Sequence, residues 1–154
     1  MKKFLNNEYF LLISRITVGT VFLMVSLAKV VHPGAFANEI GNYDLFPEII
    51  VNFSAVVLPW IELICGLLLI AGVRLKANSF VISILLVFFI LAVGSAMTRG
   101  LNIDCGCYSN IKAEKVGWNK IFENIGMLLL TLNIYFSSNK KLTLEYFALK
   151  EAKS

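Results

Sequence analysis

The chain has 154 residues, of which 58% are hydrophobic and 16% charged, and its mean hydropathy is +0.76. A water-soluble globular domain of this size could not bury so much apolar side chain, so that class is excluded. The net charge is +4, but the basic residues are scattered through connections and tails without forming a patch, which argues against nucleic-acid binding. The composition predicts a single domain, residues 1–154, covered by lipid.

Four segments are apolar over roughly the 20 residues that a helix needs to cross a bilayer. The first is too long for the apolar part of a signal peptide and lacks a following cleavage site of small residues, so we expect it to be retained. The pattern predicts an all-α fold, an integral membrane four-helix bundle. The predicted spans are residues 9–31, 53–73, 78–97 and 119–137.

The connections between these spans differ in length and composition. Residues 32–52 mix prolines with separated apolar side chains, which favours a short helix or turn lying at the membrane interface. Residues 74–77 form a tight connection, so the second and third spans should be antiparallel neighbours. Residues 98–118 form a long connection, and the tail at residues 138–154 is polar and amphipathic.

The distribution of Lys and Arg predicts the orientation. Eight lie on the side of the two termini and five on the opposite side. Cytoplasmic segments carry the excess of basic residues in membrane proteins. We therefore expect a multi-pass protein of a bacterial inner (plasma) membrane, with both termini in the cytoplasm and the two longer connections facing outward.

The long outward connection contains Cys105 and Cys107 with one glycine between them. On the oxidising side of the membrane a disulfide can persist. A disulfide between positions i and i+2 closes a small, strained ring, and strained disulfides are the ones that exchange. Arg99 would favour a thiolate, whereas Asp104 would oppose it. We favour thiol redox exchange, with both cysteines as the reacting residues.

Other interpretations of the cysteine pair stay open. Cys105 and Cys107 could clip a loop in a non-enzymatic membrane scaffold. They could also belong to a thiol metal carrier, either as a two-thiolate Cu(I) site or as half of a zinc site with His32. Because a zinc site needs four ligands and the chain has one His, no metal is predicted. Cys65, within the second span, is either an apolar filler or a relay for the exchanging pair.

Ionisable side chains inside the spans are the other candidates for a site, because they are costly in lipid and normally face the protein interior. Arg15 and Lys29 share one face of the first span, and Glu62 shares a face of the second span with Cys65 and Gly66. Either cation could reach Glu62, although Lys29 could instead extend to the interface.

The intramembrane charges also have two interpretations. They could form an ion pair that fixes helix packing, or they could border a polar pocket for a small ligand, such as a quinone head group, or a proton path. Glu123 and Asn124, near the start of the fourth span, could join the outer part of this polar cluster.

Three motifs resemble the DoxX-like superfamily of membrane proteins and, within it, the MauE (methylamine utilisation) branch. The resemblance covers residues 9–137, and the third motif decides the branch. The motifs are Arg15-x3-Gly19 followed by Lys29, Leu58-Pro59-x2-Glu62-x3-Gly66, and Arg99-Gly100-x3-Asp104-Cys105-Gly106-Cys107.

The resemblance implies a four-helix membrane bundle and a role in disulfide chemistry outside the cytoplasm, beside a thioredoxin-like periplasmic partner. It also implies a link to maturation of the disulfide-rich methylamine dehydrogenase small subunit. The chain departs from the family pattern at Tyr108-Ser109 and at Glu123-Asn124, where a basic residue is expected before Asn. By fold-level analogy with four-helix disulfide-forming proteins, electrons could pass to or from a quinone in the bundle, which would make the chain an oxidoreductase.

Overall fold

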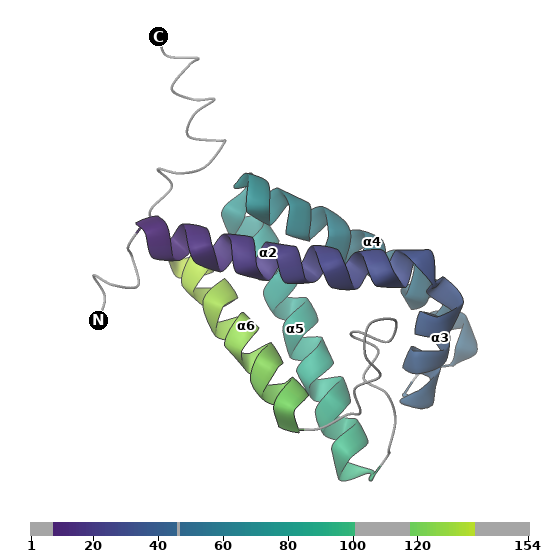
Figure 1. Cartoon of the computed structure of the whole chain (residues 1–154). Coiled ribbons are helices and arrows are strands. Elements are labelled where there is room, and N and C mark those ends of the chain that lie inside the picture. Colours follow the sequence, from purple (N-terminus) through teal and green to yellow (C-terminus); the bar gives the residue numbers. More distant parts are fainter. Residues whose placement is uncertain (1–7, 46, 101–117, 138–154) are drawn as a thin grey trace.

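The structure, a computed structural model, describes residues 8–45, 47–100 and 118–137, and these are almost entirely helical (Figure 1). The helix α2 packs closely against α4, and α5 packs against α6; α4 also contacts α5, and α2 contacts α6. The short helix α3 covers one end of the α2–α4 pair. The helices are α2 (Glu8–Val31), α3 (Pro33–Asn42), α4 (Glu48–Ala71), α5 (Leu75–Thr98) and α6 (Trp118–Phe136).

Three of the described helices, α2, α4 and α5, are long and apolar enough to cross a membrane. Each has 24 residues, which at about 1.5 Å per residue exceeds the roughly 30 Å of a hydrocarbon core. The helix α6 occupies the predicted fourth span but is not among them, because its first turns carry Lys120, Glu123 and Asn124. The protein is therefore a helical membrane protein with three candidate spans in the described residues, and the predicted four-span bundle is not confirmed.

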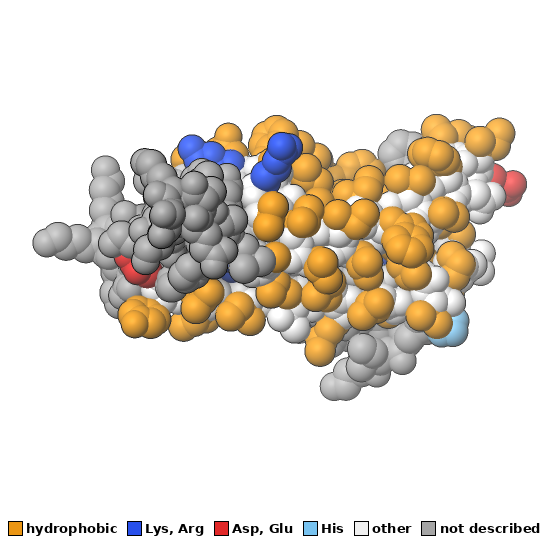
Figure 2. All heavy atoms as spheres, turned by 90° about the horizontal axis from the view of Figure 1, so that it is seen from above, with side chains coloured by type: hydrophobic (Ala, Val, Ile, Leu, Met, Phe, Trp, Pro, Cys, Tyr) orange, Lys and Arg blue, Asp and Glu red, His pale blue; other side chains and the backbone are white. Residues whose placement is uncertain are grey.

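The outer surface of these helices is apolar, as lipid contact requires. Residues such as Leu67, Phe80 and Leu91 are 56%, 55% and 66% exposed although they lie within long apolar helices. Figure 2 shows hydrophobic side chains spread over most of the described face, with Lys and Arg side chains gathered toward one end. Such a face would be poorly hydrated in water and is matched by acyl chains.

Close contact between α2 and α4 depends on two glycines. A β-carbon on Gly66 would lie 3.2 Å from the carbonyl oxygen of Gly19 and 3.2 Å from the Cβ of Phe22. A β-carbon on Gly19 would overlap the side chain of Ile70. Both backbones therefore approach closely where neither residue has a side chain, as is common in helix packing within membranes.

The reversal between α4 and α5 uses two left-handed residues. Gly72 has φ 75° and Arg74 has φ 44°. The Gly72 N–H donates to the Leu69 carbonyl at 3.2 Å and the Val73 N–H to the Leu68 carbonyl at 3.1 Å, which is the Schellman arrangement. The turn lies slightly earlier than the predicted connection at residues 74–77, because the glycine ends α4.

The helix α3 is held by buried aromatic side chains and by a hydrogen bond just after its last residue. It begins with Pro33, which suits a first helical position because that N–H would have no partner in the helix. Phe36 and Tyr43 are buried, at 3% and 8% exposure. Beyond its end, Arg99 Nη1 donates to the Tyr43 carbonyl at 2.7 Å, and Arg99 Nη2 lies 3.7 Å from Asp44 Oδ2. Arg99 therefore ties the end of α5 to the end of α3.

Candidate functional site

Lys29 and Glu62 form a buried ion pair between α2 and α4. Lys29 Nζ donates to both carboxylate oxygens of Glu62, at 3.0 Å each. The two side chains are 4% and 2% exposed. Lys29 lies in the last turn of α2, but it turns inward, so the interpretation that it extends to the interface is wrong. A buried ammonium is tolerated here because a carboxylate compensates its charge.

Two aromatic rings flank the Lys29 ammonium. The Nζ atom lies 4.5 Å from the ring centroid of Phe36, on α3, and 4.7 Å from that of Phe89, on α5. Both distances are typical of cation–π contacts. Helices α2, α3, α4 and α5 therefore all contribute to the surroundings of one ammonium group.

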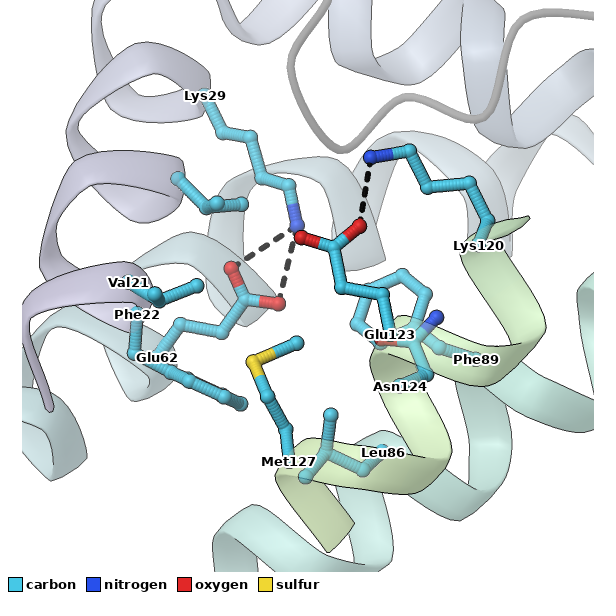
Figure 3. Close-up of a pocket in the computed structure, with 11 residues that line it drawn as sticks. Val21, Phe22, Lys29, Glu62, Leu86, Phe89, Lys120, Glu123, Asn124 and Met127 are labelled. Atoms are coloured by element: carbon cyan, nitrogen blue, oxygen red, sulfur yellow. Dashed lines mark hydrogen bonds and ion pairs between the residues drawn. The ribbon is translucent and has the colours of Figure 1, made fainter. Parts of the chain in front are cut away.

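A small cavity adjoins this pair and extends to α6 (Figure 3). Its volume is about 40 Å³, which is enough to hold water. Lys120 and Glu123 also line it, and Lys120 Nζ lies 2.9 Å from Glu123 Oε2. Asn124, 6% exposed, adds an amide to the lining. The remaining lining residues are Val21, Phe22, Val25, Leu86, Phe89 and Met127.

The cavity brings together two ion pairs, Lys29 with Glu62 and Lys120 with Glu123, inside a mostly apolar bundle. Lys120 is 7% exposed and Glu123 is 44% exposed, so the second pair leads from the cavity toward the surface. We name the group Lys29, Glu62, Lys120, Glu123 and Asn124 the polar cluster. Its donors and acceptors could bind water or the polar end of an apolar ligand, and Figure 3 shows these side chains converging on one space.

Arg15 has a different partner from the one the sequence left open. Its guanidinium Nε donates to the Leu69 carbonyl at 3.2 Å, and Nη2 donates to the Ile70 carbonyl at 3.1 Å. These carbonyls lie in the last turn of α4, where the regular helical N–H donors run out, although the Leu69 carbonyl also accepts from the Gly72 N–H. Arg15 therefore caps α4, and Lys29 is the cation that binds Glu62.

Two other predicted site residues lie away from the polar cluster's cavity lining. Cys65 is 8% exposed and belongs to the hydrophobic core with Phe22 and Leu69. His32 is exposed and immediately precedes α3. Within the described residues, no group of three or more His, Cys, Asp or Glu side chains is arranged to hold a metal ion.

The cysteine pair and Asp104 lie outside the described residues. The described chain stops at Gly100, next to the Arg99 contact with α3, and resumes at Trp118, two residues before Lys120. Both points belong to the end of the bundle that holds α3 and the polar cluster (Figure 1). The segment bearing Cys105 and Cys107 is therefore attached at both ends to this part of the molecule.

Sequence reasoning missed three members of this region. Lys120 was counted only as a basic residue of a connection, and Phe36 and Phe89 only as apolar side chains. The spacing of Lys120, Glu123 and Asn124, at three- and four-residue steps, places them on one helical face and could have indicated the cluster. Nothing in the sequence signals that the two phenylalanines meet one ammonium, because they lie 53 positions apart.

The chain was compared with known proteins. A protein of Methylorubrum extorquens (strain AM1) named methylamine utilization protein MauE is 31% identical over 117 residues, which cover 74% of this chain and 63% of that protein. The Paracoccus denitrificans protein of the same name is 27% identical, over 87% of this chain and 73% of its own length. The Methylophilus methylotrophus protein of the same name is 30% identical, over 70% of this chain and 57% of its own length.

The chain spans about three-fifths to three-quarters of the length of these relatives. No solved structure matches the chain. The predicted resemblance to the wider DoxX-like superfamily is not shown by these comparisons and stays a prediction. Residues 7–137 match the family described as methylamine utilisation protein MauE, and because this match covers most of the sequence, the chain belongs to that family.

Proposed function

We propose that this chain is a membrane-embedded thiol–disulfide redox protein of methylamine utilisation, with Cys105 and Cys107 as its exchanging pair. The single observation that carries the proposal is the Cys-Gly-Cys sequence in the segment that joins α5 to α6. A disulfide across one residue is strained and therefore exchanges readily. Membership of the MauE family supports a role in methylamine utilisation, and we propose that this role is the maturation of exported, disulfide-containing proteins.

The proposed partner is a thioredoxin-like protein outside the cytoplasm. Its dithiol would attack the Cys105–Cys107 disulfide through a mixed disulfide, leaving the partner oxidised and the two cysteines of this chain reduced. The dithiol would then be reoxidised by a membrane quinone, which takes up two electrons and two protons and becomes a hydroquinone. The orientation with both termini in the cytoplasm of an inner membrane is part of this proposal, because it puts the cysteines on the oxidising side.

The first test traps the exchange intermediate. Full-length protein with the Cys105–Cys107 disulfide formed should give a mixed disulfide with a thioredoxin-like protein whose second active-site cysteine is replaced by serine, because the remaining thiolate can attack the disulfide but cannot complete the exchange. The matched control is Cys65→Ser, because Cys65 is buried in the core and should leave exchange intact. If Cys105→Ser with Cys107→Ser leaves oxidation of exported thiols unchanged in cells, the proposal is wrong.

The second test measures the reduction potential of the cysteine pair, with and without decylubiquinone, in protein purified without oxygen. Quinone-dependent oxidation of the pair supports the proposed electron route. A pair that stays oxidised in mild reductant would favour the alternative of a non-enzymatic scaffold with a loop clip. Stoichiometric copper or zinc on the reduced protein would favour a metal carrier.

A further inference from the structure

A second, larger cavity lies between α3, α4 and α5, beside the polar cluster. Its volume is about 310 Å³, at the lower end of the range for small-molecule sites. The walls are almost entirely apolar and unusually rich in aromatic rings. Residues that represent its three walls are Phe36, Tyr43, Ile50, Ser54, Phe88 and Phe89.

The mouth of this cavity faces the bilayer rather than water. Ile50, Ile84 and Phe88 line it and are 45%, 53% and 46% exposed. They belong to α4 and α5, two of the candidate membrane spans. A ligand dissolved in the lipid can therefore reach the cavity between these two helices.

The larger cavity and the polar cluster share a wall. Phe89 lines both cavities, and Phe36 lines the larger one. These are the two rings that flank the Lys29 ammonium, at 4.5 and 4.7 Å from their centroids. The ammonium is thus separated from the aromatic cavity by the thickness of one ring.

Lys29 also retains hydrogen-bonding capacity. An ammonium has three N–H donors. In the described part of the chain, the oxygen acceptors of Lys29 Nζ are the two carboxylate oxygens of Glu62. No further oxygen acceptor of this ammonium is found among the described residues, so an additional oxygen brought between Phe36 and Phe89 would find a charged donor.

We infer that the cavity between α3, α4 and α5 binds the ring of a lipid-soluble quinone, one carbonyl oxygen of which reaches between Phe36 and Phe89 to accept a hydrogen bond from Lys29, which does not itself line the cavity. Aromatic walls suit a flat ring, the bilayer-facing mouth leaves room for an apolar tail, and the ammonium supplies the polar contact that fixes the orientation. An acyl chain would fit the apolar walls but would make no use of Lys29. This inference deepens the proposed function and rests on it for the choice of quinone as the ligand class.

The test measures binding of decylubiquinone to the full-length protein in lipid nanodiscs by titration calorimetry. Ala92→Phe should abolish binding, because Ala92 lines the cavity and the added ring would fill it. Leu91→Phe is the matched control on the same helix, since Leu91 is 66% exposed and does not line the cavity; its affinity should stay within about twofold. Ser54→Leu fills the cavity from α4 and checks the result if Ala92→Phe does not fold.

The role of Lys29 is tested by replacing both members of the ion pair, Lys29→Met with Glu62→Leu, so that no unpaired charge stays buried. Affinity for decylubiquinone should fall roughly tenfold, the loss expected for one charge-assisted hydrogen bond. Decylbenzene, which has a tail and ring but no carbonyl, should bind both proteins equally and more weakly. Equal binding of decylubiquinone and decylbenzene would instead identify a hydrocarbon site and overturn the inference, as would wild-type affinity in Ala92→Phe.

The result can be separated from the thiol chemistry. The variant with Cys105→Ser and Cys107→Ser should bind decylubiquinone as the wild type does, because the inference assigns the contacts of the quinone to residues of α2, α3, α4 and α5. Quinone binding without thiol exchange would leave the cavity assignment standing and reject the proposed function. Thiol exchange without quinone binding would support the proposed function and reject the assignment of the cavity as a quinone site.

Discussion

Lys29 and Glu62 lie 33 positions apart in the sequence, yet the ammonium of one sits symmetrically between the two carboxylate oxygens of the other, at 3.0 Å from each. The pair joins the last turn of α2 to the middle part of α4, two of the candidate membrane spans. Its neutrality as a unit is the reason that either charge is tolerated there.

Removing one member of this pair should therefore cost more than removing both. Glu62→Leu or Lys29→Met alone leaves a buried unpaired charge and should lower the free energy of unfolding by about 3–5 kcal/mol. The double variant should lie within about 1 kcal/mol of the wild type or above it. Reversible unfolding by sodium dodecyl sulfate in mixed micelles, followed by circular dichroism, measures the difference. Additive losses in the double variant would contradict the pairing.

Because α2 packs closely on α4 at Gly66, we expect the stability of the protein to depend strongly on this glycine. A valine side chain there would meet the Gly19 carbonyl and the Phe22 Cβ, both already 3.2 Å from the position of a β-carbon. Gly66→Val should destabilise the protein by about 1–3 kcal/mol. Gly94→Ala on α5 is the control, because nothing lies within 4 Å of its β-carbon position, and it should not destabilise the helix. The same unfolding assay compares the two variants.

Arg15 is predicted to stabilise the end of α4 specifically. Arg15→Leu removes the two hydrogen bonds to the Leu69 and Ile70 carbonyls. The free energy of unfolding should fall by about 1.5–3 kcal/mol for each of these bonds that water does not replace. Hydrogen exchange should rise in the last turn of α4 and much less at its start. Lys76→Gln, at an exposed position in the same end of the bundle, should change neither quantity. Uniform faster exchange along α4 would mean that the cap is not the cause.

Arg99 is predicted to hold α3 in place through the Tyr43 carbonyl rather than through Asp44. The hydrogen bond to Tyr43 is 2.7 Å long, whereas the contact with Asp44 is 3.7 Å and the Asp44 side chain is 90% exposed. Arg99→Gln should accelerate hydrogen exchange across α3. Asp44→Asn should have an effect within about 0.5 kcal/mol, since an exposed ion pair contributes little. Equal effects of the two substitutions would show that the ion pair dominates.

Much of this architecture follows from the sequence, because lipid leaves few options for an apolar segment. Hydropathy and length locate α2, α4 and α5 to within a few residues at most ends, although α4 begins at Glu48, five residues before the predicted start of the span. The early start reflects Pro47, which is extended and initiates the helix in what hydropathy alone assigned to a connection. The predicted fourth span at residues 119–137 coincides with α6, but its membrane-spanning character is not confirmed, because Lys120, Glu123 and Asn124 lower the hydropathy of its first turns.

The site is less predictable than the spans. Arg15, Lys29 and Glu62 can be identified from the sequence, because an ionisable side chain inside a membrane span is energetically costly. Helical spacing also puts Glu62 and Gly66 on one face. The partner of each charged side chain depends on the axial offset between neighbouring helices, and hydropathy does not determine this offset. The aromatic cavity is invisible for the same reason, since it forms only where α3, α4 and α5 meet.

The contacts of α2 also impose an order on biogenesis. Both of its buried cations find their partners on α4: Lys29 on the Glu62 carboxylate, and Arg15 on the carbonyls at the end of the helix. When α2 first leaves the ribosome, neither partner has been synthesised, so α2 alone would carry two uncompensated charges into the lipid. We therefore expect α2 to insert stably only together with α4, so that the two helices, with α3 between them, enter the bilayer as one cooperative unit.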